Sequence, residues 1–378
     1  MSPIKVGIIG YGFAAKNFHI PFISNVPDLE IIAILQRAQV PDGSSATPGT
    51  HCKLDFPSVR HYRSADEFFA DPDIDLVVVA TQHDTHASFA EQALRAGKHV
   101  VVDKPFAESS DQANHVIDLA EKKNLIVTCY QNRRWDGDFQ TLRDLKERGA
   151  LGDVKEAEIH YDWDSPSWLE YMTAEKFTPG EGMGFGLGPH SIDQAIVLFG
   201  TPKSVTAFNR VQRGIKSEVE DSFTIILQYD EPQQDLLVTV KTSVTSPMHH
   251  QLKHFVRGTK GSWIKFQKKS TCSQEDSIAN GIKVSDPEFG LESEAVHGTL
   301  TTLREFDPRY QSFDQDSEKY TGRIPTKRGH WSGLYQNLAD AINGKGGLEV
   351  KATQSRDGLK ILELARESHI KGATIQWH

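Results

Sequence analysis

The sequence predicts an α/β protein in which a doubly wound parallel sheet of the Rossmann type is followed by an α+β domain with a large open, mainly antiparallel sheet. Three observations carry this prediction. Short apolar runs alternate with amphipathic segments up to about residue 130, a glycine-rich turn follows the first run, and longer strand-like segments follow residue 150. Strict alternation of strands and helices is typical of a parallel sheet with helices on both faces.

The first part of the chain contains five apolar runs that predict buried strands, over residues 4–10, 28–37, 76–81, 99–105 and 125–131. The run LVVVAT at 76–81 is almost entirely apolar, as a strand buried on both faces requires. Amphipathic spacing predicts helices between these strands, over residues 14–23, 64–72, 86–97 and 109–123. These elements form a predicted first domain, residues 1–130.

The predicted second domain, residues 131–378, has a different pattern. Six longer segments suit an antiparallel sheet with one open face, and they span residues 154–163, 204–212, 221–229, 235–244, 250–258 and 262–267. Residues 270–328 are polar and rich in turn formers, which predicts a long ordered excursion outside the core. Two amphipathic helices, over 330–343 and 355–368, end the chain, and one option is that they pack back on the first domain.

Composition excludes several classes of protein. With 42 basic and 51 acidic side chains among 378 residues, a net charge of −9 disfavours binding to nucleic acid or to anionic membranes. No apolar run reaches the roughly 18 residues of a membrane span. The three widely spaced cysteines and the histidine spacing support neither a disulfide framework nor a metal site, so no metal is expected. The N-terminus lacks the pattern of a signal peptide, so the cytoplasm is the expected location.

The turn after the first strand predicts a dinucleotide site. Gly10, Gly12 and Ala15 match the Gly-x-Gly-x-x-Gly/Ala pattern between a predicted strand and a predicted helix, with Phe13 and Ala14 inside the same turn. The first glycine allows the tight turn, the second lets the backbone approach a pyrophosphate, and a small third residue allows close packing of helix on strand. The helix N-terminus adds free N–H donors and the positive end of its dipole.

The end of the second strand favours NADP over NAD. It reads Gln36-Arg37, and the acidic residues Asp28 and Glu30 lie at the start of the strand, too early to accept ribose hydroxyls. Arg37 suits a 2′-phosphate because a guanidinium donates charge-assisted hydrogen bonds to that group. The alternative is an ordinary solvated arginine in a loop.

Five segments resemble the Gfo/Idh/MocA family of oxidoreductases (glucose-fructose oxidoreductase, inositol dehydrogenase and rhizopine catabolism). They lie at residues 7–15, 77–107, 130–139, 151–163 and 184–200. The segment YQNRRWDGDF is similar to the scyllo-inositol dehydrogenase subgroup, whose members prefer NADP. The resemblance implies hydride transfer between a nicotinamide and a secondary alcohol carbon of a sugar or cyclitol. It also implies a C-terminal open sheet that mediates dimer or tetramer contacts.

Asp103-Lys104-Pro105 follows a buried strand, at the edge of the sheet where ligands bind in open α/β folds. Pro105 favours an extended conformation for Lys104, which directs the lysine off the strand end. In the family this motif is usually Glu-Lys-Pro, and the lysine contacts the substrate hydroxyl. The resemblance therefore implies a catalytic role for Lys104, with Asp103 beside it at the cofactor, while a lysine on an ordinary loop is the alternative.

Pro189-His190 opens a predicted helix, and the family places its proton-exchanging histidine at this position. The positive end of the helix dipole would favour neutral His190, which can accept a proton in alcohol oxidation. Many relatives carry an aspartate four residues earlier, where this chain has Gly186. Asp193, one turn after His190, is a candidate for orienting the imidazole, with helix capping as the alternative.

The remaining candidates follow other predicted strands. Asn132, Arg133, Arg134 and Asp136 offer donors and an acceptor suited to several substrate hydroxyls, with a charged linker as the alternative. Tyr161 could stack on a sugar ring, although core packing is the more common use of such a residue. Three residues after the 76–81 strand are expected near the cofactor, namely Thr81, His83 and His86.

Together these features predict an NADP-dependent oxidoreductase of sugars or cyclitols that assembles as a homodimer or homotetramer. The alternative is a non-catalytic dinucleotide-binding regulator of the same fold, which Gly186 and Asp103 favour because both depart from the family pattern. Lys104 and His190 argue against that alternative, since a binding module needs neither. The sequence leaves open which polyol reacts, at which carbon and in which direction.

Overall fold

The computed structural model describes residues 2–42, 46–268 and 272–378. The chain divides into two units, Met1–Gln131 with Trp331–Leu359 and Asn132–His330 with Lys360–His378. Residues 270 and 271, where the predicted polar excursion begins, lie outside the described residues. Within the described ranges, no helix has both the length and the apolar character needed to cross a membrane.

The first unit contains a parallel sheet with the strand order β3-β2-β1-β4-β5-β6. Its strands are β1 (Ile4–Ile9), β2 (Leu29–Leu35), β3 (Arg60–Tyr62), β4 (Leu76–Val79), β5 (His99–Val102) and β6 (Val127–Cys129). All four residues of β4 are buried, as its apolar sequence predicts. This order confirms the doubly wound Rossmann sheet. The strand β3 was not predicted, because its three residues are polar or aromatic and form no apolar run.

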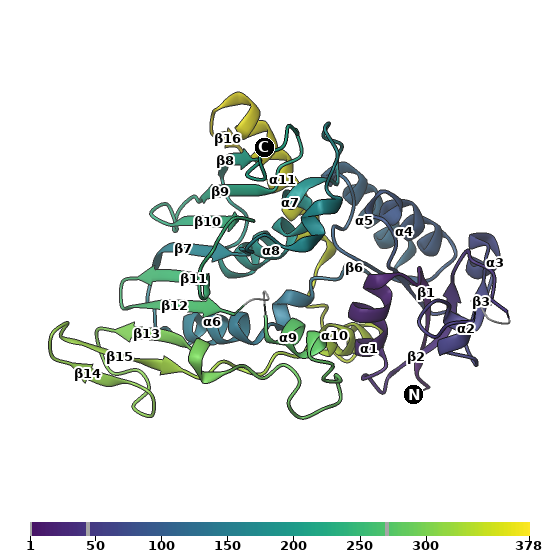
Figure 1. Cartoon of the computed structure of the whole chain (residues 1–378), viewed down its shortest axis with the longest axis horizontal. Coiled ribbons are helices and arrows are strands. Elements are labelled where there is room, and N and C mark those ends of the chain that lie inside the picture. Colours follow the sequence, from purple (N-terminus) through teal and green to yellow (C-terminus); the bar gives the residue numbers. More distant parts are fainter. Residues whose placement is uncertain (1, 43–45, 269–271) are drawn as a thin grey trace. The chain divides into compact units, whose positions relative to one another are not determined.

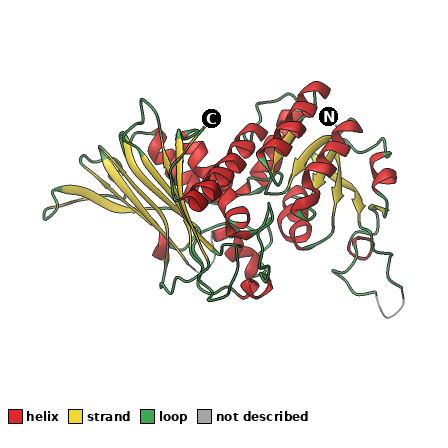
Figure 2. Ribbon diagram, turned by 90° about the horizontal axis from the view of Figure 1, so that it is seen from above, coloured by secondary structure: helices red, strands yellow, loops and turns green. Residues whose placement is uncertain are grey.

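Helices lie on both sides of this sheet (Figure 2). They are η1 (Ala15–His19), α1 (Ile20–Ile23), α2 (Cys52–Asp55), α3 (Ala65–Phe69), η3 (His83–Thr85), α4 (His86–Arg95), α5 (Ser110–Lys123), α10 (Ser332–Ile342) and the first part of α11 (Ala352–Lys371). The late helix α10 packs on α1 through Trp331, whose ring lies 5.4 Å from that of Phe22. This unit therefore combines the N-terminal part of the chain with a segment near the C-terminus.

The second unit contains a ten-stranded sheet with the order β14-β15-β13-β12-β11-β7-β10-β9-β8-β16 (Figure 1). Its strands are β7 (Val154–His160), β8 (Ser204–Arg210), β9 (Ser222–Gln228), β10 (Leu237–Thr242), β11 (Gln251–Gly258), β12 (Gly261–Gln267), β13 (Gly298–Thr302), β14 (Ser312–Asp314), β15 (Lys319–Ile324) and β16 (Ile375–Gln376). Among the described strand pairs of this sheet, β7–β10 is parallel and the others are antiparallel. The predicted large, mainly antiparallel sheet is thus confirmed.

The excursion predicted outside the core over 270–328 is wrong in part. This region supplies β13, β14 and β15, which extend the sheet, and Leu300 of β13 is fully buried. The sequence hid these strands because they are short and carry threonine and lysine rather than apolar residues.

One face of this sheet carries the helical elements of the second unit. They are η4 (Asn132–Trp135), α6 (Gly137–Glu147), η5 (Ser167–Tyr171), α7 (Gly182–Gly186), α8 (Gly188–Phe199), α9 (Ser273–Ala279) and η6 (Glu294–Val296). The helix α8 packs on β7 and β10, the two central parallel strands. Residues that alternate with the buried ones point to the other face and are partly exposed, among them Phe208, Leu237 and Phe266.

Candidate functional site

The glycine turn after β1 has the geometry of a dinucleotide cradle. Gly10 has φ +100°, and a Cβ at this position would lie 2.4 Å from the carbonyl oxygen of Ala80. No other residue fits there. A Cβ at Gly12 would meet nothing within 4 Å, so the bare backbone borders open space at the start of the helix. Ala15 is fully buried beneath it. These residues fit a pyrophosphate bound at the helix N-terminus.

The residues that follow β2 have separate uses. The Gln36 amide donates to the Thr50 carbonyl at 3.1 Å and accepts from the Cys52 N–H at 2.9 Å. Both ends of the amide therefore hold the neighbouring loop, and the contact of Gln36 with the cofactor stays a prediction. Arg37 is exposed, and Nε of the exposed Arg63 donates to its carbonyl at 3.0 Å. Two guanidinium-bearing residues thus meet at the carboxyl edge of β2 and β3.

Asp103 shapes the loop that carries Lys104. One oxygen of its carboxylate accepts from the Lys104 N–H at 2.7 Å, and the other lies 3.5 Å from Nε2 of His19. Burial alone would raise the pKa of Asp103, but the hydrogen bond and charge of His19 and the charge of Lys104 hold that pKa below its usual range. Nδ1 of His19 lies 2.6 Å from the Tyr335 hydroxyl. The Asp103 carboxylate therefore positions this loop, and its place at the cofactor stays a prediction.

His86 lies close to the backbone of two loops at this edge, and its place at the cofactor stays a prediction. Its side chain is buried, with Nδ1 2.7 Å from the Pro105 carbonyl and Nε2 3.1 Å from the Thr81 carbonyl. Burial lowers its pKa, which favours the neutral ring. A neutral ring donates from one nitrogen only, so it bonds one of these two carbonyls; Nδ1 lies closer to its carbonyl, that of Pro105 in the loop that holds Lys104. Thr81 and the half-buried His83 lie at the start of the loop after β4.

His190 lies in the first turn of α8 and is 5% exposed. Its ring stacks on that of Tyr161, with centroids 5.7 Å apart and an interplanar angle of 29°. Pro189 precedes it near the start of the helix, where a missing N–H costs no intrahelical bond. The helix start and the tyrosine ring together fix the orientation of the imidazole.

Asp193 and Arg134 form a buried bidentate pair. Nε of Arg134 donates to one carboxylate oxygen at 2.8 Å, and Nη2 donates to the other at 2.7 Å. Both residues are at most 3% exposed. The pair joins η4 to α8. Asp193 and Arg134 thus bind each other, while the predicted contacts of Asp193 with the imidazole and of Arg134 with substrate stay predictions.

The other polar residues of η4 are buried, so the alternative of a solvated linker is wrong. Arg133 pairs with Asp136 at 3.3 Å and also with Glu275 of α9. Burial would lower the pKa of Arg133, but the neighbouring acidic groups keep it above its ordinary value. Asn132 is 5% exposed.

Tyr161 directly follows β7 and is fully buried, with its ring packed on that of His190, which agrees with the alternative of core packing. Lys253 Nζ lies 3.3 Å from the centroid of its ring, and the Arg133 guanidinium lies 5.7 Å from that centroid. Within the described part of the chain its hydroxyl has no hydrogen-bond partner. Burial raises the pKa of this hydroxyl well above its ordinary value, which keeps it a donor.

Sequence reasoning missed Lys253, which is fully buried on β11. Burial lowers the pKa of this ammonium, against the charges of Asp138 and Asp136. A buried lysine on a strand gives no motif, and its position beside Tyr161 depends on the register between β11 and β7. The only available signal was a lysine at an inward position of an otherwise apolar alternation.

Gly186 ends a short helix in which every second residue is glycine. A Cβ at Gly182 would lie 2.3 Å from the Glu220 carboxylate, and the Gly184 N–H donates to that carboxylate at 3.0 Å. Burial raises the pKa of Glu220. The glycines of α7 therefore leave room for the buried Glu220 carboxyl group, which lies just before β9. The sequence did not predict this contact.

Comparison with known proteins assigns both units. A family model described as an oxidoreductase family with an NAD-binding Rossmann fold matches residues 4–131, and the GFO/IDH/MocA C-terminal domain matches residues 139–264. The uncharacterized oxidoreductase C115.03 of Schizosaccharomyces pombe is 37% identical, covering 100% of both chains. The NADP(+)-dependent scyllo-inositol 2-dehydrogenase IolW of Bacillus subtilis is 31% identical, covering 98% of this chain and 95% of its own. The solved structure of the oxidoreductase yvaA from Bacillus subtilis aligns with a TM-score of 0.84 at 29% identity, covering 100% of this chain and 99% of its own.

Proposed function

Because the chain belongs to the Gfo/Idh/MocA family of NAD(P)-dependent oxidoreductases, we propose that it transfers a hydride between NADP and a secondary alcohol or ketone carbon of a sugar or cyclitol. The observation that carries this proposal is Lys104, which His86 and Asp103 hold at the carboxyl edge of the sheet that bears the bare glycine turn. Ligands bind at this edge in open α/β sheets.

The roles of the protein groups follow from their chemistry. The nicotinamide, when bound, accepts the hydride from the carbinol carbon or returns it. The Lys104 ammonium stabilises negative charge on the reacting oxygen, as a preorganised donor does. His190 accepts the hydroxyl proton at a ring nitrogen during oxidation and returns it during reduction. Its stacking on Tyr161 holds the ring in one orientation. Asp193 contributes through Arg134, as a positioning residue.

Arg37 supports NADP as the cofactor, with NAD as the less favoured choice. The guanidinium is exposed at the end of β2, and Arg63 is anchored to the Arg37 carbonyl. A 2′-phosphate beside these residues would receive charge-assisted hydrogen bonds. The similarity to a relative named as NADP(+)-dependent agrees with this choice.

A polyol substrate is supported by the polar groups of the second unit. The Tyr161 hydroxyl is buried and lacks a partner within the described residues, so it suits a substrate hydroxyl. The relative IolW is named for a cyclitol. The buried cysteines Cys52, Cys129 and Cys272 form no disulfide within the described residues, which suits a reducing compartment such as the cytoplasm.

A non-catalytic regulator remains the second candidate, and Gly186 is the observation that favours it. The discriminating experiment follows absorbance at 340 nm with NADP⁺ or NADPH and a panel of cyclitols, aldoses and their keto forms. We expect turnover with at least one cyclitol, and loss of turnover with retained cofactor binding in Lys104→Met. Tight cofactor binding without turnover on the whole panel would favour the regulator.

A further inference from the structure

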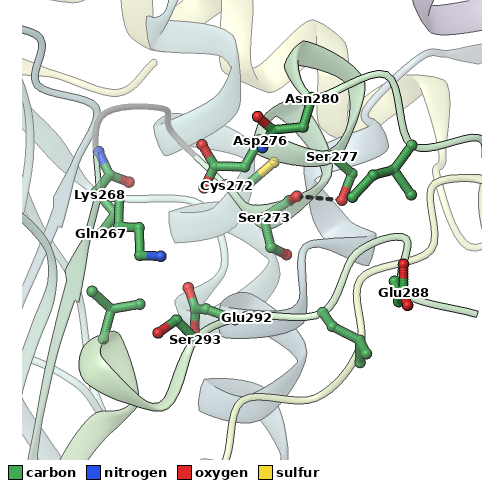
Figure 3. Close-up of a pocket in the computed structure, with 13 residues that line it drawn as sticks. Gln267, Lys268, Cys272, Ser273, Asp276, Ser277, Asn280, Glu288, Glu292 and Ser293 are labelled. Carbon is green, nitrogen blue, oxygen red and sulfur yellow. Dashed lines mark hydrogen bonds between the residues drawn. The ribbon is translucent and has the colours of Figure 1, made fainter.

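A pocket of about 160 Å³ lies in the second unit, bordered by the end of β12, by α9 and by the segment before η6. Its wall includes Gln267, Cys272, Glu292 and Ser293. Figure 3 shows the Gln267 side chain reaching into the space between Cys272 and Glu292. None of these residues has a role in the proposed hydride transfer.

The Gln267 amide is the feature of this pocket that points to a ligand. The residue is 2% exposed, and neither its amide nitrogen nor its amide oxygen has a hydrogen-bond partner within residues 2–42, 46–268 and 272–378. Burying a donor and an acceptor without partners is costly, so such groups normally bond to ordered water or to a ligand. The register of β12 against β11 holds the amide at this position, because Gln267 pairs with Gln251.

Other polar groups of the wall already have partners in the protein. Glu292 accepts from Lys265 Nζ at 2.8 Å and also from the Thr326 hydroxyl. The Ser273 hydroxyl donates to the Gly290 carbonyl at 3.0 Å, and the Ser277 hydroxyl donates to the Ser273 carbonyl at 2.9 Å. These bonds make the wall rigid. A ligand would therefore find the Gln267 amide ready to bond without breaking protein contacts.

The charges of the wall select against an anion. The wall carries three acidic residues and one lysine, namely Asp276, Glu288, Glu292 and Lys268. A primary amide presents an acceptor and two donors side by side, which matches two neighbouring hydroxyl groups of a polyol. The pocket volume is several times the roughly 30 Å³ that one water occupies in the liquid, so a small solute can enter.

We propose that this pocket binds a small uncharged polyol, with one hydroxyl donating to the Gln267 amide oxygen and a neighbouring hydroxyl accepting from the amide nitrogen. The proposal concerns binding and does not require turnover. It assigns the second unit a polyol site made of residues other than His190 and its neighbours.

The first test is a crystal structure of the full chain soaked in scyllo-inositol. A polyol within hydrogen-bond distance of the Gln267 amide is expected, and Gln267→Leu crystals soaked in the same way should lose it. Ordered water alone in the pocket of the unmodified chain would overturn the proposal, and so would a polyol retained by the variant. A polyol seen at Gln267 but not near His190 would count against the proposed reaction while supporting this site.

The second test is equilibrium dialysis with radiolabelled scyllo-inositol in solution. Gln267→Leu should weaken binding at this pocket at least tenfold and so release about one bound polyol per chain. Gln234→Leu is the matched control, because Gln234 is exposed in the loop between β9 and β10. This variant should bind polyol as the unmodified chain does. Equal binding by all three proteins would refute the site. The soaked unmodified crystals decide the matter even if Gln267→Leu fails to fold.

Discussion

Arg37 stands where NAD-binding domains usually carry a carboxylate that accepts both ribose hydroxyls. Its side chain is exposed, and in the described ranges the carboxylates of β2 and its approach, Asp28 and Glu30, lie at the opposite end of the strand. A guanidinium at this position attracts the 2′-phosphate of NADP, whereas a carboxylate in its place would repel that phosphate. The charge at this position therefore discriminates between NADP and NAD.

Replacing Arg37 by aspartate should therefore weaken NADP binding by about 2 kcal/mol, because a charge-assisted contact is lost and a repulsion is added. NAD affinity should stay the same or improve. Fluorescence titration of NADPH and NADH with both proteins measures the change. An unaltered NADPH affinity would show that the 2′-phosphate is recognised elsewhere.

His190 is expected to carry the proton of the reaction. In His190→Asn the ring that exchanges the proton is gone, while the stacking place against Tyr161 remains filled by a smaller polar group. Turnover should fall, and its pH profile should lose the limb near neutral pH. If that limb persists at the reduced rate, another group titrates in the reaction. His249→Asn is the control, since His249 lies in the loop between β10 and β11, where its ring stacks on that of His250.

The end of β7 holds a histidine between two carboxylates. Nδ1 of His160 lies 2.9 Å from Asp162, and Nε2 lies 2.8 Å from Glu158. Burial would lower the pKa of His160, but the two hydrogen bonds and the charges of these carboxylates raise it above its ordinary value. The strand end is thus fixed by a charged imidazole next to the buried Tyr161.

This arrangement predicts how unfolding depends on pH. Because the folded pKa of His160 is raised, its stabilising effect is complete below the unfolded value of about 6.5 and disappears as pH rises through the folded pKa. Urea unfolding should show the free energy of unfolding falling from pH 6 to pH 9, with a smaller fall in His160→Gln. An identical pH dependence in both proteins would contradict the assigned charge.

The sequence predicted the long apolar strands well, because runs such as 76–81 are buried on both faces and carry their own signal. It failed for β3 and for β13 to β15, where pairing with a neighbouring strand rather than apolar content creates the strand. The residues of the two proposed sites divide in the same way. Lys104 and His190 come with motifs, whereas Lys253 and Gln267 take their positions from sheet register, which a single sequence does not encode locally.

The open face of the ten-stranded sheet is the surface through which we propose that the chain forms a homodimer or homotetramer. Register places Phe208, Leu237, Phe255, Ile264 and Phe266 on this one face. The side chain of Phe208 is 53% exposed and that of Phe266 is 39% exposed. Exposed apolar side chains that share one sheet face suit an interaction surface.

Light scattering coupled to gel filtration tests this assembly. The unmodified chain should elute as a dimer or tetramer, and Phe266→Glu should shift it towards the monomer because a carboxylate would be buried without a partner. Ile370→Glu is the control, since Ile370 of α11 is 70% exposed and lies away from the open face. A monomeric unmodified chain, or a Phe266→Glu variant that assembles normally, would argue against the sheet face.

The proposed reaction itself can be followed by the fate of one hydrogen. The chain is incubated with NADP⁺ and a cyclitol deuterated at its carbinol carbons, and the nicotinamide is analysed by mass spectrometry. One deuterium in each reduced nicotinamide is the predicted result, with no label transferred by Lys104→Met. Reduced nicotinamide without deuterium, or no reduction although both molecules bind, would contradict hydride transfer from a secondary alcohol carbon.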